Sequence, residues 1–160
     1  MKKYGCFLFV TMAFVSNLLF AVGVGGSVPN ITLPLVSNSS AKVNVAGINS
    51  KYVLIDFWAS WCAPCRVSMS TLSKLSNSLG SKGFKVIGIS LDKDPALAKQ
   101  FLKKYPASFT QLLDTQGISA QQFGLPKVPT SYLIGPNKKV IGIFPGYNEA
   151  NLKAIRELVK

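Results

Sequence analysis

Residues 51–69 read KYVLIDFWASWCAPCRVSM, and this stretch decides the fold. Its first part, residues 52–58, is apolar and rich in β-branched and aromatic side chains, which predicts a buried strand. Cys62 and Cys65 follow after a short link, and the apolar residues then repeat at helical spacing. Two thiols one helical turn apart, at the start of a helix that follows a buried strand, are typical of a site for thiol–disulfide exchange.

The rest of the chain predicts further strands and helices around this stretch. Val67, Met69, Leu72, Leu75 and Leu79 have helical spacing, so the helix after the second cysteine is expected to bury them. The other expected elements are a β-hairpin within 28–45, a strand at 84–90, a helix at 94–105, a strand near 109–113, a helix at 118–123, strands at 131–134 and 140–144, and a helix from about 148. This order predicts an α/β fold, in which a mixed sheet with a parallel part is covered by helices on both faces.

The first 22 residues predict an export signal or a membrane anchor. A positively charged start, Met1-Lys2-Lys3, precedes the almost entirely apolar residues 5–22, and Leu19-Phe20-Ala21 offers a small-residue cleavage site. About 18 apolar residues also reach the lower limit for crossing a bilayer, so an uncleaved anchor associated with the membrane is the alternative. The expected location is the periplasm or cell envelope, with residues 27–160 as one domain.

The composition narrows the classes of function. The chain of 160 residues carries 18 Lys or Arg, 6 Asp or Glu and no His, for a formal net charge of +12. The basic residues are scattered in ones and twos rather than clustered with aromatic side chains, so nucleic acid is not an expected partner. A basic surface instead favours acidic partners and anionic membranes.

The cysteine count points to redox chemistry. Cys6 lies in the predicted signal, so removal of that segment leaves only Cys62 and Cys65. Their small loop contributes little loop-closure entropy, which argues against a purely structural disulfide. Without His or a further Cys, the pair cannot complete a four-ligand zinc site within one chain. No metal and no cofactor are therefore expected beyond the redox-active pair itself.

The chain resembles the thioredoxin superfamily and is most similar to the exported thioredoxin-like proteins of the TlpA/ResA type. The resemblance rests on Trp61-Cys62-Ala63-Pro64-Cys65 after the buried strand, and on Val128-Pro129-Thr130 downstream. It covers residues 27–160 and implies a thioredoxin-like fold with a central mixed sheet flanked by helices, an N-terminal β-hairpin and an extra strand–helix insertion. The implied partners are disulfide-containing envelope proteins and a membrane thiol electron donor of the DsbD/CcdA type.

The position of each cysteine predicts its role. Cys62, at the helix N-terminus, meets unpaired backbone N–H groups and the positive end of the helix dipole, which favour a thiolate. It is expected to be the attacking, more exposed sulfur, whereas Cys65, one turn further in, is expected to resolve the mixed disulfide. Pro64 stiffens this turn, where its missing N–H costs little. Trp61 and Pro64 are expected to contact the substrate.

Asp56 interrupts the apolar strand with a carboxylate. A buried acid is costly unless it is paired or functional. An edge or solvent-facing position is one interpretation, and a buried acid–base group beneath the cysteines is the other. An acid stands at the matching position of thioredoxins, where it assists proton transfer for the buried thiol. The resemblance therefore implies that Asp56 deprotonates Cys65.

Pro129 resembles the cis-proline of the superfamily, whose loop faces the active-site disulfide. Cis peptide bonds are almost confined to proline, and proline is rarely placed just before a buried strand without a reason. Val128 would then offer its backbone N–H and C=O to an extended substrate strand. An ordinary trans proline in a turn is the alternative.

Two positions depart from the TlpA/ResA pattern. Many of those proteins carry Glu three residues after the second cysteine and Pro two residues further on, whereas this chain has Ser68 and Ser70. The departure puts a Glu-dependent substrate pocket in doubt. It also weakens the case for one substrate, apocytochrome c, and for a role in cytochrome c maturation.

The leading prediction is an exported thiol–disulfide oxidoreductase. Ala63-Pro64 between the cysteines, together with the absence of His, favours a reductase or isomerase over a strong oxidase. A thiol peroxidase of the related redoxin class would need a Thr three residues before its reactive Cys, and residues 55–61 read IDFWASW without Thr. A metal carrier is the non-enzymatic alternative, since Cys-x-x-Cys can hold copper or share zinc across a dimer.

Overall fold

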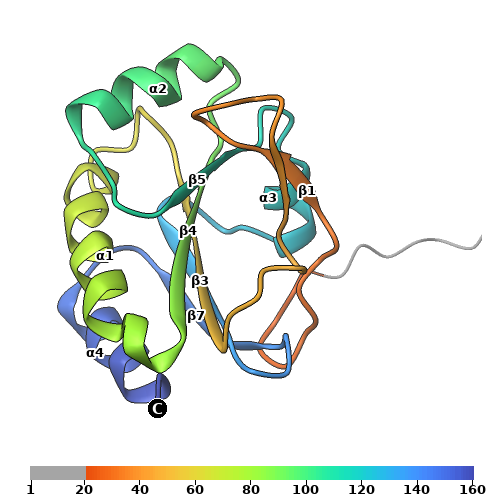
Figure 1. The fold of residues 1–160 in the computed structure, drawn as a ribbon, viewed down its shortest axis with the longest axis vertical. Helices are drawn as coiled ribbons and strands as arrows, with labels where there is room; N and C mark the ends of the chain where they lie inside the picture. Colours follow the sequence, from red (N-terminus) through yellow and green to blue (C-terminus); the bar gives the residue numbers. More distant parts are fainter. Residues whose placement is uncertain (1–20) are drawn as a thin grey trace, which may run out of the picture.

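The apolar strand at residues 52–58 forms the centre of a five-stranded sheet in the computed structural model, which describes residues 21–160 (Figure 1). The strands are β3 (Tyr52–Trp58), β4 (Phe84–Ser90), β5 (Thr110–Leu113), β6 (Thr130–Ile134) and β7 (Val140–Pro145). Their order across the sheet is β5-β4-β3-β6-β7. The first three are parallel, whereas β6 is antiparallel to β3 and β7 is antiparallel to β6.

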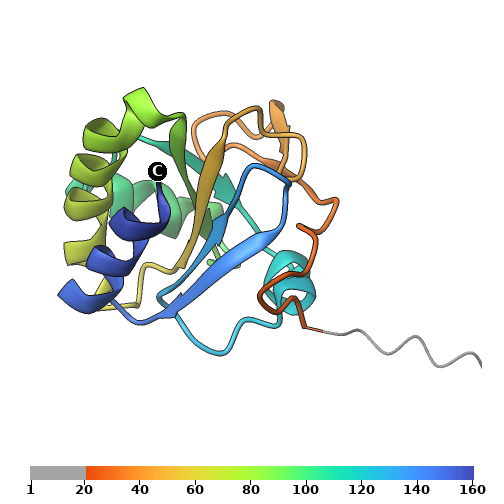
Figure 2. The same ribbon diagram turned by 90° about the horizontal axis from the view of Figure 1, so that it is seen from below.

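Helices cover both faces of this sheet. One face carries α1 (Cys65–Leu79) and α4 (Glu149–Leu158), and the opposite face carries α3 (Ile118–Phe123), as Figures 1 and 2 show. The remaining helix, α2 (Pro95–Lys104), lies beyond the end of the sheet where α1 begins. The expected mixed sheet with helices on both faces, a thioredoxin-like fold, is confirmed.

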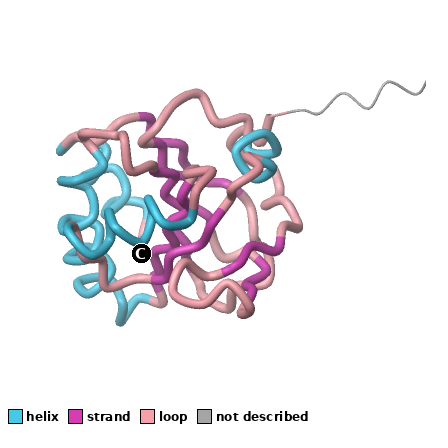
Figure 3. The backbone as a smooth tube through the Cα atoms, turned by 90° about the horizontal axis from the view of Figure 1, so that it is seen from above, coloured by secondary structure: helices cyan, strands magenta, loops and turns pink. Residues whose placement is uncertain are grey.

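The N-terminal hairpin is a separate two-stranded sheet. Its strands β1 (Thr32–Pro34) and β2 (Lys42–Asn44) pair in antiparallel register and lie on the same side of the central sheet as α3 (Figure 3). Ile31 and Leu33 join the hydrophobic cluster on that side, so the hairpin helps to cover the face that α3 leaves open. The extra strand and helix expected from the resemblance lie between β4 and β6, where the chain forms α2, β5 and α3.

Alternation along β3 divides the core into two layers. Val53, Ile55 and Phe57 belong to the cluster beneath the hairpin and α3. Leu54 belongs to the cluster that contains Leu72 of α1 and, from α4, Leu152 and Ile155. Because successive strand residues point to opposite faces, the even-numbered residues of β3 face α1 and α4. Asp56 is one of these residues, so its carboxyl lies on the helix-covered face that also receives Cys65.

The helix ends follow the expected capping rules. Asp94 caps α2 by accepting a hydrogen bond from Ala96 N–H (2.8 Å), and Pro95 occupies the first helical position. Asn148 caps α4 in the same way, accepting from Asn151 N–H (2.9 Å). After α1, a single 3-10 turn (η1, Gly80–Lys82) leads to Gly83 at φ 71°, a left-handed conformation that favours glycine.

One expectation about α1 is wrong. Met69, Leu72, Leu75 and Leu79 are buried as predicted, whereas Val67 has 58% of its surface exposed. Val67 is two residues from Met69, and two residues turn an α-helix by more than half a revolution. Its side chain therefore lies outside the buried stripe.

The expected signal or anchor at residues 1–22, including Cys6, lies outside the described residues except for its last two positions. Across residues 21–160, none of the helices combines the length and the apolar character that a membrane crossing requires. Whether the N-terminal segment is cleaved stays a prediction.

Candidate redox-active site

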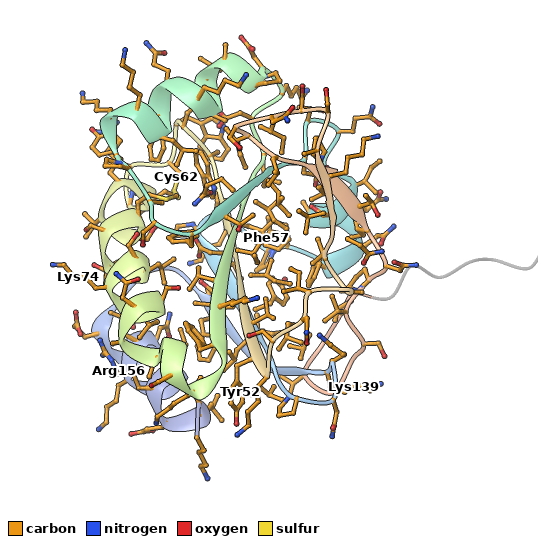
Figure 4. The ribbon with its side chains drawn as sticks, in the orientation of Figure 1. Tyr52, Phe57, Cys62, Lys74, Lys139 and Arg156 are labelled. Carbon is orange, nitrogen blue, oxygen red and sulfur yellow. A yellow bond between two sulfur atoms is a disulfide. The ribbon has the colours of Figure 1, made fainter. Side chains whose placement is uncertain are left out.

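Cys62 and Cys65 form a disulfide at the junction between β3 and α1, with their Cα atoms 5.4 Å apart. Figure 4 shows Cys62 where the loop from β3 meets the first turn of α1, below α2, whereas Tyr52 marks the opposite end of β3. The turn is closed by backbone hydrogen bonds from Cys62 N–H to the carbonyl of Ala59 (3.1 Å) and from Cys65 N–H to that of Cys62 (3.2 Å). These bonds fix the turn that carries the disulfide.

Cys62 precedes the helix rather than belonging to it. The α-helix begins at Cys65, and Pro64, at φ −65° and ψ −23°, occupies the N-cap position with a helical backbone. The expectation that Cys62 starts the helix is therefore corrected by one turn. Cys62 still lies beside the positive end of a 15-residue helix whose first turn carries no acidic side chain. That end of the dipole favours an anionic sulfur nearby.

The two cysteines differ in exposure in the predicted direction, but narrowly. Cys62 has 3% of its surface exposed and Cys65 has none. Both belong to a hydrophobic cluster with Trp58, Met69 and Phe101, the last of these from α2. A substrate sulfur can therefore reach the pair only from the side of Cys62. This ranking fits an attacking Cys62 and a resolving Cys65.

The loop that carries the pair is tied to the end of β4 by Asp92, a residue that the sequence did not single out. The Asp92 carboxylate accepts hydrogen bonds from Ser60 N–H (3.0 and 3.2 Å to its two oxygens), Ser60 O–H (2.7 Å) and Ser90 O–H (2.9 Å). Asp92 is itself buried. A signal was present in the sequence, because an acid directly after a parallel strand lies at the sheet edge where the loops of neighbouring strands meet.

Asp56 is buried, with 1% of its surface exposed, so the edge or solvent-facing interpretation is wrong. Its Oδ1 accepts a hydrogen bond from Ser131 O–H (2.6 Å), and Ser131 is its direct neighbour on β6. Within residues 21–160, its Oδ2 has no hydrogen-bond partner. Burial raises the pKa of Asp56 from 3.8 to about 7, and the hydrogen bond from Ser131 opposes this rise.

Such a carboxyl can both accept and release a proton near neutral pH. Asp56 lies on the α1 face of β3, between Leu54 and Trp58 in the strand alternation. Trp58 belongs to the same cluster as Cys65, so the carboxyl lies in the layer beneath the buried cysteine. Asp56 and Cys65 therefore lie on the same side of the sheet, and proton transfer between them stays a prediction.

The Val128–Pro129 peptide bond is cis, as the resemblance implied. Pro129 is buried, and the side chain of Val128 packs against the cluster that contains both cysteines. Thr130 O–H donates to the carbonyl of Lys127 (2.8 Å), and Gly146 N–H donates to that of Pro129 (2.8 Å), so the loop is held at both ends. In the described part of the chain, the N–H and C=O of Val128 make no hydrogen bond and are free to pair with an added strand.

Exposed apolar side chains surround the pair. Trp61, next to Cys62, has 69% of its surface exposed, and Val67 and Leu97 are exposed as well. Leu97 also lines a shallow pocket of about 360 Å³ with Ser60, Arg66 and Tyr105. Pro64, two residues after Cys62, is exposed as well. Exposed apolar groups gathered at one place on a surface mark sites of protein–protein contact.

Ser68, which stands where many TlpA/ResA-type proteins carry Glu, is buried on the inner side of α1. Its hydroxyl donates to the carbonyl of Cys65 (2.9 Å). Ser70 is exposed and donates to the carbonyl of Val67 (3.2 Å). This position therefore supplies no carboxylate, and its polar group is engaged by the backbone of its own helix.

Over the described residues, no group of three or more His, Cys, Asp and Glu side chains is placed to hold a metal ion. The site consists of the Cys62–Cys65 pair, the carboxyl of Asp56 beneath it and the Val128–Pro129 loop beside it. Residues 23–159 match the family described as Redoxin.

The chain belongs to the Redoxin family. It is 27% identical over 161 residues to the thiol-disulfide oxidoreductase ResA of Oceanobacillus iheyensis, with 91% of this chain and 84% of that protein covered. It is also 24% identical over 136 residues to ResA of Bacillus subtilis, with 82% and 75% covered.

The chain is also similar to solved structures of thiol–disulfide exchange proteins. A protein described as a thiol:disulfide interchange protein DsbE from Chlorobium tepidum has a TM-score of 0.79 and 32% identity, with 86% of this chain and 95% of that chain covered. A thiol-disulfide oxidoreductase from Bacteroides fragilis has a TM-score of 0.71 and 29% identity, with 82% and 98% covered. The protein is a thiol–disulfide oxidoreductase of the ResA/DsbE type, with Cys62 and Cys65 as its Cys-x-x-Cys pair.

Proposed function

We propose that the protein is exported and reduces, or isomerises, disulfides of envelope proteins through a dithiol–disulfide cycle of Cys62 and Cys65. The observation that carries this proposal is the geometry of the pair: a disulfide in which Cys62 keeps 3% of its surface exposed and Cys65 keeps none, on the face of the sheet that also carries the buried Asp56. The cycle needs no bound cofactor, because the cysteines themselves carry the two electrons.

The reducing half-cycle begins with the dithiol form. The Cys62 thiolate attacks one sulfur of the substrate disulfide, which forms a mixed disulfide and releases the other substrate sulfur as a thiolate. Cys65 then gives its proton to the Asp56 carboxylate and attacks the Cys62 sulfur. The mixed disulfide breaks, the second substrate sulfur leaves as a thiolate, and the Cys62–Cys65 disulfide remains. Two electrons have moved to the substrate, and its thiolates take up protons from solvent.

The substrate is held, in this proposal, as an extended strand beside the pair. The free N–H and C=O of Val128 offer a backbone ladder, and Trp61 and Pro64 offer an apolar surface on the other side of Cys62. Backbone pairing gives affinity for many sequences, whereas side-chain pockets give selectivity. With Ser68 in place of Glu, the site offers no carboxylate that would select apocytochrome c, so we propose a broad class of envelope disulfides.

A reductase must be reduced again after each turnover. Two electrons and two protons must come from outside the chain, and a membrane thiol donor of the DsbD/CcdA type would supply them by the same exchange chemistry. The direction follows from the residues between the cysteines: Ala63 and Pro64 provide no cationic side chain to stabilise the thiolate. We expect a reduction potential near about −270 mV, and a value near about −120 mV would instead indicate an oxidase.

Insulin reduction tests the activity. With dithiothreitol as electron source, wild-type protein is expected to accelerate reduction of the insulin disulfides, and Cys62→Ser to abolish the acceleration. Cys65→Ser is expected to accumulate a mixed disulfide, because no thiol remains to resolve it. Absence of Cys62-dependent turnover, together with stoichiometric uptake of copper or zinc, would favour the metal carrier. Turnover of peroxide that depends on Cys62 would favour the peroxidase.

Cell fractionation tests the export. The full chain is expected in the envelope fraction, and a variant that lacks residues 1–22 is expected in the cytoplasm, since the positive start and the apolar segment would be gone. Mass spectrometry of the envelope form distinguishes a cleaved signal from an anchor. An envelope form that retains its first residues would favour the anchor.

A further inference from the structure

Within residues 21–160, two buried side-chain polar atoms have no hydrogen-bond partner: Asp56 Oδ2 and Gln111 Nε2. Both side chains are more than nine-tenths buried, since Gln111 has 9% of its surface exposed and Asp56 has 1%. One of the atoms is an acceptor and the other is a donor. Buried polar groups are rarely left unpaired, so each of these two atoms calls for a partner.

The two residues lie in one row across the sheet. Asp56 of β3 pairs with Gly88 of β4, and Gly88 pairs with Gln111 of β5. Residues paired in a parallel sheet present their side chains on the same face. The residue between the acid and the amide has no side chain, so nothing attached to β4 separates them.

The Gln111 side chain uses the space above Gly88. A Cβ atom on Gly88 would lie 2.1 Å from Gln111 Oε1 and 2.9 Å from Nε2. The amide therefore lies over the middle strand rather than over its own. Only glycine at position 88 permits this approach.

Trp58 determines which way the amide faces. Its indole Nε1–H donates to Gln111 Oε1 (2.9 Å), and both groups are buried. An indole N–H can only donate, so the amide oxygen must face Trp58 and the amide nitrogen must face elsewhere. The free atom of Gln111 is thus necessarily the donor, which is the complement of the free carboxylate oxygen of Asp56.

We propose that Gln111 is a positioning residue for the proton chemistry of Asp56, through one bound water that accepts from Nε2 and donates to Oδ2 above Gly88. Asp56 and Gln111 are two strands apart, so their Cα atoms are about 10 Å from each other. Because the glutamine side chain extends over the middle strand, one water suffices to connect Nε2 with Oδ2. A buried water requires two or more polar partners, and these two atoms provide them.

The water would stabilise the charged form of Asp56. Only the carboxylate can take the Cys65 proton in the resolving step described above, after which Cys65 attacks the Cys62 sulfur and the substrate thiolate leaves. A hydrogen bond to the carboxylate lowers the pKa of a buried acid and so increases the fraction that can act as a base. The effect on the resolving step rests on the proposed function, whereas the placement of Gln111 near Asp56 does not.

Few other groups can tune Asp56 from the surrounding elements. β4 contributes Gly88, β6 contributes the hydroxyl of Ser131 and α1 contributes Cys65. The charged side chains of β4 and α1 are exposed at the surface. Among the described strands packed around it, β3 carries one charged residue, Asp56 itself, and β5 and β6 carry none. The exposed ones are Arg66, Lys74 and Lys85. The buried acids Asp92 and Asp114 lie after the ends of β4 and β5 and accept hydrogen bonds there.

The test is a pH titration of the Asp56 carboxyl carbon by NMR in the reduced protein. Gln111→Met keeps a side chain of similar length and volume without the amide, and is expected to raise the pKa of Asp56 by about one pH unit or more, the loss of a hydrogen bond to a charged group. Gln111→Glu keeps an oxygen for Trp58 but replaces the donor, and is expected to raise this pKa as well, because two carboxylates repel. An unchanged pKa in either folded variant would overturn the proposal.

A double-mutant cycle separates positioning from a purely structural role. Gln111→Met is expected to shift the pH profile of the resolving step in the wild-type background and to leave it unshifted in Asp56→Asn. An equal loss of rate in both backgrounds would assign Gln111 a packing role only. The carboxyl titration uses no substrate, so its outcome is independent of the insulin assay that decides the proposed function.

Discussion

Asp56 shows how the surroundings of one residue set its chemistry. A lone acid in an apolar strand already indicates an unusual group. The hydrogen bond from Ser131 and the unpaired second oxygen belong to the folded sheet, where a strand more than seventy residues later in the chain lies beside β3. Burial outweighs that single hydrogen bond, so the pKa rises to about 7 rather than falling.

The raised pKa makes stability depend on pH. Between pH 3.8 and about 7 the folded protein keeps the Asp56 proton that the unfolded chain has lost. Because the folded state then binds more protons, its stability falls as the pH rises through this window. Asp56→Asn removes the titration, so it is expected to stabilise the protein on the order of 2–4 kcal/mol at about pH 8 and to have little effect below about pH 4. Thermal unfolding at both pH values measures this.

Ser131→Ala is the matched control. It removes the hydrogen bond that opposes the rise, so the pKa of Asp56 should increase further, and the loss of stability should continue to higher pH and become larger in total. A stability difference between Asp56→Asn and wild type that is the same at every pH would contradict the assignment.

Trp61 is the residue beside Cys62 that we expect to contact the substrate. Its side chain is largely exposed beside Cys62, so its removal should affect substrate contact rather than folding. Trp61→Ala is expected to lower kcat/KM for a protein disulfide about fivefold to tenfold, the loss of about 1 kcal/mol or slightly more of contact. The reduction potential should remain unchanged.

Val24→Ala provides the comparison for Trp61. Val24 is similarly exposed but lies in the N-terminal segment, next to Gly25, which is hydrogen-bonded to Val140 of β7. Its replacement should leave kcat/KM unaltered. Equal losses from both variants would mean that exposed apolar surface, and not contact beside Cys62, governs the rate.

At the scale of elements, the site depends on the connection between the β3–α1 loop and the end of β4. Directly after β4, Asp92 accepts hydrogen bonds from the N–H and O–H of Ser60, and Leu91 N–H donates to the carbonyl of Trp58 (2.9 Å). The loop is therefore held on the strand next to β3 before α1 begins. A pair of cysteines on an untethered loop would lose the fixed geometry that exchange requires.

Asp92→Ala is expected to destabilise the protein by about 2 kcal/mol, because the partly buried N–H and O–H of Ser60 lose their acceptor. The rate of insulin reduction should fall several-fold as the loop loosens. Asp94→Ala removes a helix cap only two residues away and is expected to cost about 1 kcal/mol without altering the rate. Denaturant unfolding and insulin reduction on both variants give the comparison. An Asp92→Ala protein with the rate of wild type would show that the tether is not needed for exchange.

At the scale of the whole molecule, most charged side chains of residues 21–160 are not in ion pairs. The formal net charge is +12, and in the chain from residue 21 onward the one ion pair is that between Lys153 and Glu157, 4.0 Å apart and exposed. An exposed pair of this kind contributes little. The cations are therefore free to attract acidic partners over the surface.

This distribution predicts a salt dependence that differs between substrates. Reduction of an acidic disulfide peptide is expected to slow as salt rises from about 0.01 to about 0.15 M, where the Debye length falls from about 30 to about 8 Å. For a basic peptide of the same length, the rate should increase as salt rises, because salt screens the repulsion between the peptide and the basic protein. Stopped-flow measurement of both peptides tests this. Identical salt profiles would mean that the overall charge does not steer the substrate.

The sequence by itself determined the secondary structure, the layers and the reactive pair. Those features depend on local patterns: the apolar run of β3, the helical spacing after Cys65, and proline and capping residues at the ends. Val67 is the exception: it is apolar, but its angle around the helix places it outside the buried stripe. The order of exposure of Cys62 and Cys65 also followed from their positions before and at the start of α1.

Only the tertiary structure decided which side chains share the site. Ser131, Gln111 and Asp92 lie on other strands or loops, and hydrogen bonds and burial join them to the β3–α1 junction. A strand pattern tells which face a residue occupies but not its partners, because strand order and register are set by packing between distant segments. The pKa of Asp56 depends on these partners, so it follows from the folded sheet and not from the sequence pattern.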